Sequence, residues 1–248
     1  MNKNSSPAGA QGSDQLLGTA PIGRLILKLA LPAVAAQFIN VLYNIVDRIY
    51  IGNIPGIGAT ALTGVGVAFP ILMVISAFAA FAGMGGAPLA SIRLGAGDKK
   101  GAERILGNSF CFLLIISLVL TVGFQVFKRP LLYAFGASDN LIGYATDYIT
   151  IYLWGTVSVQ LALGLNTFIS AQGRSTTAML SVAIGAVLNL LLDPLFIFVF
   201  GMGVKGAAVA TIISQTVSAV WVVAFLFSQS SVIRLRRATL RIEPRVLG

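Results

Sequence analysis

The chain has no histidine, a single cysteine and few charged residues, and each shortage excludes a class of protein. With His 0 and Cys 1 in 248 residues, neither a disulfide framework nor a Cys/His metal site is available. Charged residues make up 10% of the chain and hydrophobic residues 56%, whereas a soluble domain carries roughly 25% charged residues. The mean hydropathy of +0.89 therefore predicts an integral membrane protein. Since no nucleophile–base set is present, neither an enzyme nor a cofactor is expected.

Six apolar segments are long enough to cross a bilayer, whose hydrocarbon core of about 30 Å needs about 20 helical residues. They lie at residues 25–51, 61–84, 105–127, 143–168, 177–201 and 206–228. The sequence therefore predicts an all-α polytopic membrane protein, with six transmembrane helices forming one lobe, residues 21–230. Residues 1–20 are polar and lack the regions of a signal peptide, so we expect a disordered cytoplasmic tail. The basic segment 231–248 is expected either to lie along the inner leaflet or to be a linker to a further segment.

The distribution of basic residues predicts the orientation of this lobe. If the N-terminus is cytoplasmic, 13 of the 17 Lys and Arg residues fall in cytoplasmic segments. The outer segments then hold only Lys128, Arg129 and Lys205, with Arg48 at a helix end. This is the positive-inside pattern of a multi-pass protein of the cell membrane. The net charge of +9 thus indicates membrane topology rather than a nucleic-acid partner.

Two carboxylates, Asp47 and Asp193, lie inside otherwise apolar runs. Between residues 29 and 92 the only charges are Asp47 and its neighbour Arg48, and Asp193 is alone in residues 175–204. A charged side chain at the bilayer centre costs about 2.5–3.5 kcal/mol on the insertion scale, so such residues are usually functional. Two structural alternatives stay open: Asp47 could reach the outer interface, and Asp193 could cap a helix or bond to a neighbouring one.

Further polar residues share helical faces with these two acids. Gln37, Asn40 and Asn44 precede Asp47 at steps of three and four residues, so all four lie on one stripe. Asn189 lies one turn before the second acid. Such stripes should face a cavity or another helix rather than lipid, although the three amides would serve equally well as hydrogen bonds between helices.

Two other predicted helices carry polar side chains at comparable positions. Thr211 and Gln215 lie one turn apart on the sixth, and Tyr148 and Tyr152 lie one turn apart on the fourth, with Asn166 deeper. Taken singly, a Thr near a helix start often bonds to its own backbone. The two tyrosines would equally suit an interfacial aromatic belt.

Four of these polar residues are expected at a similar depth in the bilayer. With the N-terminus cytoplasmic, the two acids, Thr211 and Tyr148 all fall in the outer half of the bilayer. Carboxylate, amide and hydroxyl oxygens are hard ligands, which suits H⁺ or Na⁺. Two carboxylates in a low dielectric cannot both stay charged cheaply, so one is expected to hold a proton until a cation or substrate displaces it.

Three stretches resemble the multidrug and toxic compound extrusion (MATE) transporters. The run Asn-Leu-Leu-Leu-Asp-Pro at 189–194, followed by glycines and small residues up to position 211, resembles their fifth and sixth helices. Residues 31–52, with Leu-Pro at the start and Asp-Arg-Ile-Tyr-Ile-Gly at the end, resemble their first helix. The Gly- and Pro-bearing stretch 66–98 resembles their second helix and first cytoplasmic loop. The resemblance runs from about residue 22 to residue 248.

The resemblance implies a site and two hinges. The chain is most similar to the prokaryotic branch of this family, whose amino-terminal lobe carries the cation site. Matched residue by residue, the cation-binding or protonation site would be Asp47, Asn189, Asp193, Thr211 and Tyr148, with Asn166 as a further candidate. Candidate cavity-lining residues are Gln37, Asn40, Asn44, Tyr152 and Gln215. Pro32 matches a proline associated with bending of the first helix. Pro194 is the second candidate hinge, because each proline removes one helical hydrogen bond.

The resemblance also implies a function. It predicts a secondary antiporter that exports amphipathic, often cationic, drugs or toxic compounds in exchange for H⁺ or Na⁺. Because members of this family have twelve helices in two lobes, a second six-helix lobe is the expected partner. Two alternatives stay open: a flippase for lipid-linked precursors from the same superfamily, and a membrane fragment that does not transport.

Overall fold

The protein is almost entirely helical over the residues that its computed structural model describes, 22–236, with side chains from Leu27 onward except for positions 28 and 29. The helices are α2 (Ile22–Gly52), α3 (Gly58–Gly95), α4 (Lys99–Ala134), α5 (Ile142–Trp154), α6 (Thr156–Ala171), α7 (Ser175–Pro194), the π-helix η1 (Leu195–Val199) and α8 (Val204–Phe227). The predicted all-α class is confirmed. The predictions for the tail 1–20 and for residues 237–248 lie outside the described residues.

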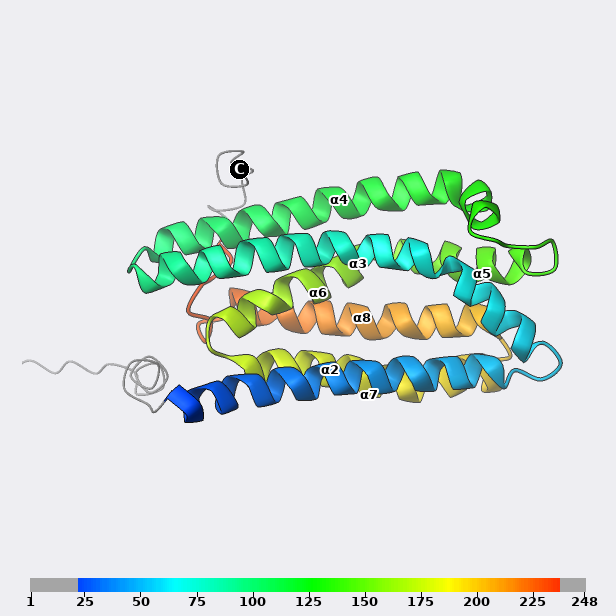
Figure 1. Cartoon of the computed structure of the whole chain (residues 1–248), viewed down its shortest axis with the longest axis horizontal. Coiled ribbons are helices and arrows are strands. Elements are labelled where there is room, and N and C mark those ends of the chain that lie inside the picture. Colours follow the sequence, from blue (N-terminus) through cyan, green and yellow to red (C-terminus); the bar gives the residue numbers. More distant parts are fainter. Residues whose placement is uncertain (1–21, 237–248) are drawn as a thin grey trace, which may run out of the picture.

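The long helices run side by side along one axis (Figure 1). Five of the described helices are long and apolar enough to cross a membrane, and the bent pair α5–α6 makes a sixth if it counts as one span. The start of α2, the α3–α4 and α6–α7 turns and residues 228–236 lie at one end of the bundle, here called the N-terminal end. The α2–α3, α4–α5 and α7–α8 connections lie at the other, the far end.

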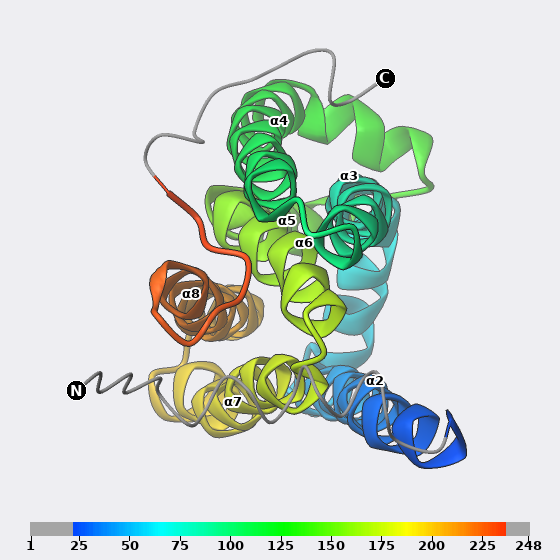
Figure 2. The same ribbon diagram turned by 90° about the vertical axis from the view of Figure 1, so that its left-hand side faces the viewer.

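Helix α6 occupies the middle of the bundle, where it packs on α3, α4, α7 and α8 (Figure 2). Helix α2 lies at the edge and packs mainly on α7. Small residues set the close approach of α3 to α6: a Cβ added to Gly83 would lie 2.9 Å from the carbonyl oxygen of Gly164. This is the usual way in which membrane helices gain packing contacts, since lipid gives them no hydrophobic drive to associate.

The fourth predicted span is broken in two. The sequence predicted one helix over 143–168, but α5 and α6 meet at Gly155 with a bend of 61°. At the break the carbonyl oxygen of Leu153 accepts hydrogen bonds from the hydroxyls of Thr156 and, across the bundle, Thr121. Position 155 has no room for a side chain, because a Cβ there would lie 2.5 Å from Cγ1 of Ile212 on α8. These contacts hold α5 and α6 at different angles to the bundle axis.

Helix α4 also departs from the prediction, which ended its span at residue 127. It continues to Ala134, and its last turns swing across the bundle axis (Figures 1 and 2). A straight helix of 36 residues would measure about 54 Å at 1.5 Å per residue, well beyond a hydrocarbon core of about 30 Å. The turn across the axis keeps the end of α4 at the level of the other far-end connections.

The chain returns to the bundle after α8 rather than leaving it. Ser231, Ile233 and Leu235 are buried, and the amide of Leu235 donates to the carbonyl of Leu226 at 2.9 Å. Of the segment predicted as a linker, residues 231–236 therefore form part of the N-terminal end of the lobe.

Candidate functional site

The two acids singled out from the sequence face one another across the α2–α7 contact. Asp47 lies in the last third of α2 and Asp193 in the last turn of α7, and their carboxyl groups are within hydrogen-bonding reach of each other. Asp193 is fully buried, with an exposed fraction of 0%. The Nδ2 group of Asn189 donates to Oδ1 of Asp193 at 3.1 Å.

Each acid of this pair, Asp47 and Asp193, has one buried oxygen without a hydrogen-bond partner among the described residues. Oδ1 of Asp47 and Oδ2 of Asp193 are both buried and accept no hydrogen bond from any described residue. Two carboxylates this close cannot both stay ionised without a counter-charge, so a shared proton or a bound cation fits the geometry. The carbonyl of the Asn189 amide is likewise buried without a partner, which adds a neutral oxygen ligand beside the pair.

Proline 194 fixes where the regular part of α7 ends. Because proline has no N–H, the helical ladder is interrupted after Asp193. The next five residues form η1, in which the amide of Phe200 donates to the carbonyl of Leu195, five residues back. Short π segments of this kind often lie at functional sites. Pro32, by contrast, lies inside α2 with helical backbone on both sides.

A cavity of about 260 Å³, here called the acid cavity, opens beside Asp47. Tyr148, Tyr152 and Thr211 line it together with Asn40, Asn44 and Gln215. The two tyrosine rings are stacked with centroids 6.0 Å apart, and the Tyr148 hydroxyl is within hydrogen-bonding reach of the Thr211 side chain. The bend at Gly155 is what allows α5 to carry these tyrosines against α8 while α6 continues through the centre of the bundle.

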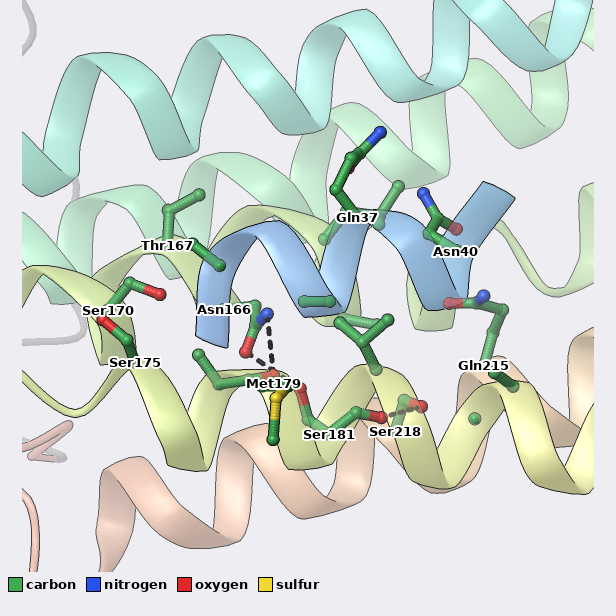
Figure 3. Close-up of a pocket in the computed structure, with 18 of the residues that line it drawn as sticks. Gln37, Asn40, Asn166, Thr167, Ser170, Ser175, Met179, Ser181, Gln215 and Ser218 are labelled. Atoms are coloured by element: carbon green, nitrogen blue, oxygen red, sulfur yellow. Dashed lines mark hydrogen bonds between the residues drawn. The ribbon is translucent and has the colours of Figure 1, made fainter. Parts of the chain in front are cut away.

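A second cavity of about 240 Å³, here called the amide cavity, lies nearer the N-terminal end (Figure 3). Gln37 and Asn166 line it, and Asn166 is held by neighbours: its Nδ2 donates to the carbonyl of Ala178 at 3.2 Å and its Oδ1 accepts from Ser181 at 2.9 Å. The Ser218 hydroxyl donates to the carbonyl of Ser181, so this network ties α6, α7 and α8 together. The structure thus places Asn166 in a different cavity from the acid pair.

The two cavities share part of their wall. Asn40, Tyr43, Leu163 and Gln215 line both. The Tyr43 hydroxyl is within hydrogen-bonding reach of the side chains of Asn44 and Gln215, so it stands at the boundary. Tyr43 was not among the residues expected at the site, although its spacing of three from Asn40 and four from Asp47 places it on the same stripe.

The chemistry of both cavities is polar but carries little charge. Among the described residues, neither lining includes a Lys or Arg, and Asp47 is the only acid in either cavity wall. No cluster of three or more His, Cys, Asp or Glu residues forms within the described part of the chain. The walls of the acid cavity also include Phe69, Leu72 and Met73. Such a site suits a proton or a light cation beside a compound with apolar and cationic parts.

A bundle of membrane-length helices around a buried acid pair defines a polytopic membrane protein of the transporter class. The family model MatE matches residues 32–195, and the chain belongs to this family of membrane transporters, which are not enzymes. The resemblance read from the helix motifs is therefore confirmed.

Several curated relatives match most of this chain but only part of their own length. It is 27% identical to a protein of Shewanella oneidensis described as an FAD transporter, over 81% of this chain and 44% of the relative. It is 26% identical to the multidrug export protein MepA of Staphylococcus haemolyticus, over 82% of this chain and 45% of the relative. It is 29% identical to the probable multidrug resistance protein NorM of Thermotoga maritima, over 80% of this chain and 43% of the relative. The chain spans about half the length of these relatives.

Solved structures agree with this picture. A crystal structure of MATE in the bent conformation superposes with a TM-score of 0.86 at 30% sequence identity, and the match covers 95% of this chain and 52% of that one. The described residues therefore have the fold of about half of a solved MATE transporter.

Proposed function

We propose that the chain forms one lobe of an ion-coupled antiporter that exports amphipathic, often cationic, small molecules. The observation that carries the proposal is the acid pair: each acid has one buried oxygen without a donor, and Asp47 lines the acid cavity. In this proposal H⁺ or Na⁺ binds at the pair and a cationic substrate competes with it. The cation site consists of Asp47, Asn189, Asp193, Thr211 and Tyr148. Asn166, which lies in the amide cavity, contributes to the substrate side of the lobe.

The walls of the two cavities favour neutral or cationic substrates over anionic ones. The FAD named for one relative carries phosphate charges, which would need Arg, Lys or a helix N-terminus beside them. Neither lining includes a basic side chain among the described residues. The same observation argues against a flippase for lipid-linked precursors, whose pyrophosphate would need a cationic cavity. Stacked tyrosines beside a carboxylate instead suit an aromatic cation.

The proposal includes an orientation and a partner. We infer that the N-terminal end faces the cytoplasm and that the lobe lies in the cell membrane, because most of the basic residues in the described part of the chain fall at that end. A second six-helix lobe would provide the opposite wall for alternating access. Binding or loss of the cation would then change the bend of α2 at Pro32 and of α7 at Pro194, and so the shape of the acid cavity.

The test is ethidium efflux under an imposed H⁺ or Na⁺ gradient in proteoliposomes. Asp193→Asn should abolish gradient-driven efflux while insertion into the membrane stays unchanged. Asp147→Asn is the matched control, because Asp147 forms a half-exposed ion pair with Lys205 at 3.4 Å outside both cavities. Full efflux by the Asp193→Asn protein would overturn the proposed role of the acid pair. If the parent chain shows no efflux either, the lobe does not transport on its own.

Measuring H⁺ and Na⁺ uptake separately against pH would identify the coupling ion. The oxygens of Asp47, Asp193 and Thr211 can bind either ion, so the types of ligand do not distinguish H⁺ from Na⁺. Uptake of one ion that stops in the Asp193→Asn protein assigns that ion to the site.

A further inference from the structure

The acid cavity has a buried floor and an exposed rim. The tyrosines form the floor, since Tyr148 and Tyr152 line the cavity and are only 4% and 8% exposed. Phe69 and Met73 of α3 line the same cavity but are 41% and 59% exposed. Asn44 of α2 is an exposed part of the wall as well, and these last three residues are here called the rim. A compound that places an aromatic ring against the tyrosines would extend toward the rim.

Arg48 lies beside this rim. Its Cζ atom is 5.3 Å from the centroid of the Phe69 ring, which is a cation–π contact. Helical spacing agrees with this position, because Arg48 follows Asn44 by one turn on the same face of α2. The guanidinium is also close enough to the neighbouring Asp47 to act on its carboxyl group electrostatically. Arg48 is not part of the cavity wall, so it acts on a bound compound through its charge rather than by direct contact.

The positive charge of Arg48 is not neutralised by an ion pair. The residue is exposed, and among the residues that the structure describes it bonds to no carboxylate. The adjacent Asp47 instead faces Asp193, whose carboxyl group is within hydrogen-bonding reach. An acid pair that shares one proton carries one negative charge, and one bound monocation neutralises it. A second positive charge on the same compound would then meet the guanidinium with no anion to offset the repulsion.

We propose that Arg48 makes the acid cavity selective for compounds with a single positive charge, because it repels a second positive charge at the rim. The inference rests on the proposed function and adds a specificity-determining residue to it. The contact with Phe69 holds the guanidinium at the rim, so the repulsion acts at a fixed place. Of two compounds with the same aromatic core, the dication should therefore bind more weakly than the monocation.

Ethidium and propidium test the proposal, because they share a phenanthridinium core and propidium carries one further quaternary ammonium group. Fluorescence titration of the full chain in non-ionic detergent at low ionic strength gives the Kd of each dye. Arg48→Gln should lower the ratio of the propidium Kd to the ethidium Kd by about fivefold, the effect of two unit charges a few side-chain lengths apart near a protein surface. Arg48→Lys keeps the charge and should keep the parent ratio.

Arg129→Gln is the matched control, because it removes an exposed cation from the last turns of α4, outside both cavities. The ratio should stay at the parent level. The proposal is overturned if Arg48→Gln leaves the ratio unchanged, or if Arg129→Gln lowers it as much. Ethidium binding that Asp193→Asn does not weaken would instead overturn the proposed function, and this inference with it. Equal melting temperatures of all variants show that each fold is intact.

Discussion

At the scale of single residues, the acid pair lowers the stability of the lobe, because it buries carboxyl oxygens that have no hydrogen-bond donor. Two buried carboxyl oxygens without donors would usually be replaced by an acid–amide pair, which satisfies both groups. Proteins keep such unsatisfied groups mainly where function needs them, at a cost in stability. Asn189 offsets only part of this cost, because its amide reaches Oδ1 of Asp193 and leaves Oδ2 unpartnered.

The first prediction concerns this pair. Asp47→Asn would place an N–H donor within reach of the Asp193 carboxylate, so we expect the lobe to gain about 1 kcal/mol in stability and to lose ion-coupled transport. Thermal unfolding in detergent at neutral pH measures the stability. Asp147→Asn should change it by less than about 0.5 kcal/mol, as for other surface positions. An Asp47→Asn protein that unfolds at a lower temperature than the parent would contradict the geometry of the pair.

At the scale of helices, the break between α5 and α6 determines where the tyrosines of the acid cavity lie. Gly155 lies against Ile212 of α8, and the Thr121 hydroxyl satisfies a carbonyl that the break exposes. The composition and length of the segment predicted a membrane span here, and that part is right. The break depends on contacts from α4 and α8, which are distant in sequence, so helical periodicity within the segment could not reveal it.

The second prediction tests this contact. Gly155→Ala should destabilise the lobe by about 1–3 kcal/mol, the usual cost of overpacking a closely packed site. The added methyl group would also push α5 away from α8 and disturb Tyr148 and Tyr152. Ile212→Ala removes the atoms that the methyl meets, at a packing cost of its own, so Gly155→Ala should cost much less in an Ile212→Ala chain than in the parent. If Gly155→Ala costs as much in both chains, the clash is not the cause.

At the scale of the whole molecule, the N-terminal end is closed by the chain that follows α8. A single side-chain oxygen, Oε1 of Gln172, accepts three hydrogen bonds: from the Ser231 hydroxyl at 2.9 Å and from the amides of Val232 at 2.8 Å and Ile233 at 2.9 Å. Arg236 then reaches Oε2 of the buried Glu103 at 3.0 Å. This strap, residues 228–236, ties α8 to the α6–α7 turn and to the start of α4.

The third prediction is that Gln172→Leu frees the strap. The backbone amides of Val232 and Ile233 would lose their acceptor, with a cost of about 1–3 kcal/mol for a buried donor left unsatisfied. Their hydrogen exchange should therefore become faster while exchange in α6 stays unchanged. Gln172→Glu keeps an acceptor oxygen at the same place and should retain most of the protection. Unchanged exchange in the Gln172→Leu protein would show that the strap is held by its buried apolar residues alone.

The sequence predicted the membrane class and most of the spans, because these depend on local composition. That Asp47 and Asp193 meet depends on the packing of α2 on α7, which spacing within one helix does not determine. Asp47, Tyr148 and Thr211 were expected at one level, and the structure brings them to one cavity. Asn166 was grouped with them, yet α6 carries it toward the N-terminal end, since the bend at Gly155 changes the course of the helix. Residues 231–248 were expected to lie along the inner leaflet or to form a linker. Ser231, Ile233 and Leu235 in this segment are buried, which its basic composition did not indicate.

The broken span also bears on how the protein enters the membrane. Helix α5 has 13 residues and α6 has 16, or about 20 and 24 Å at 1.5 Å per residue, and neither alone crosses a hydrocarbon core of about 30 Å. At the junction the Leu153 carbonyl accepts the hydroxyl of Thr121, which belongs to the preceding helix. The final shape of the fourth span therefore depends on α4, which precedes it in the chain.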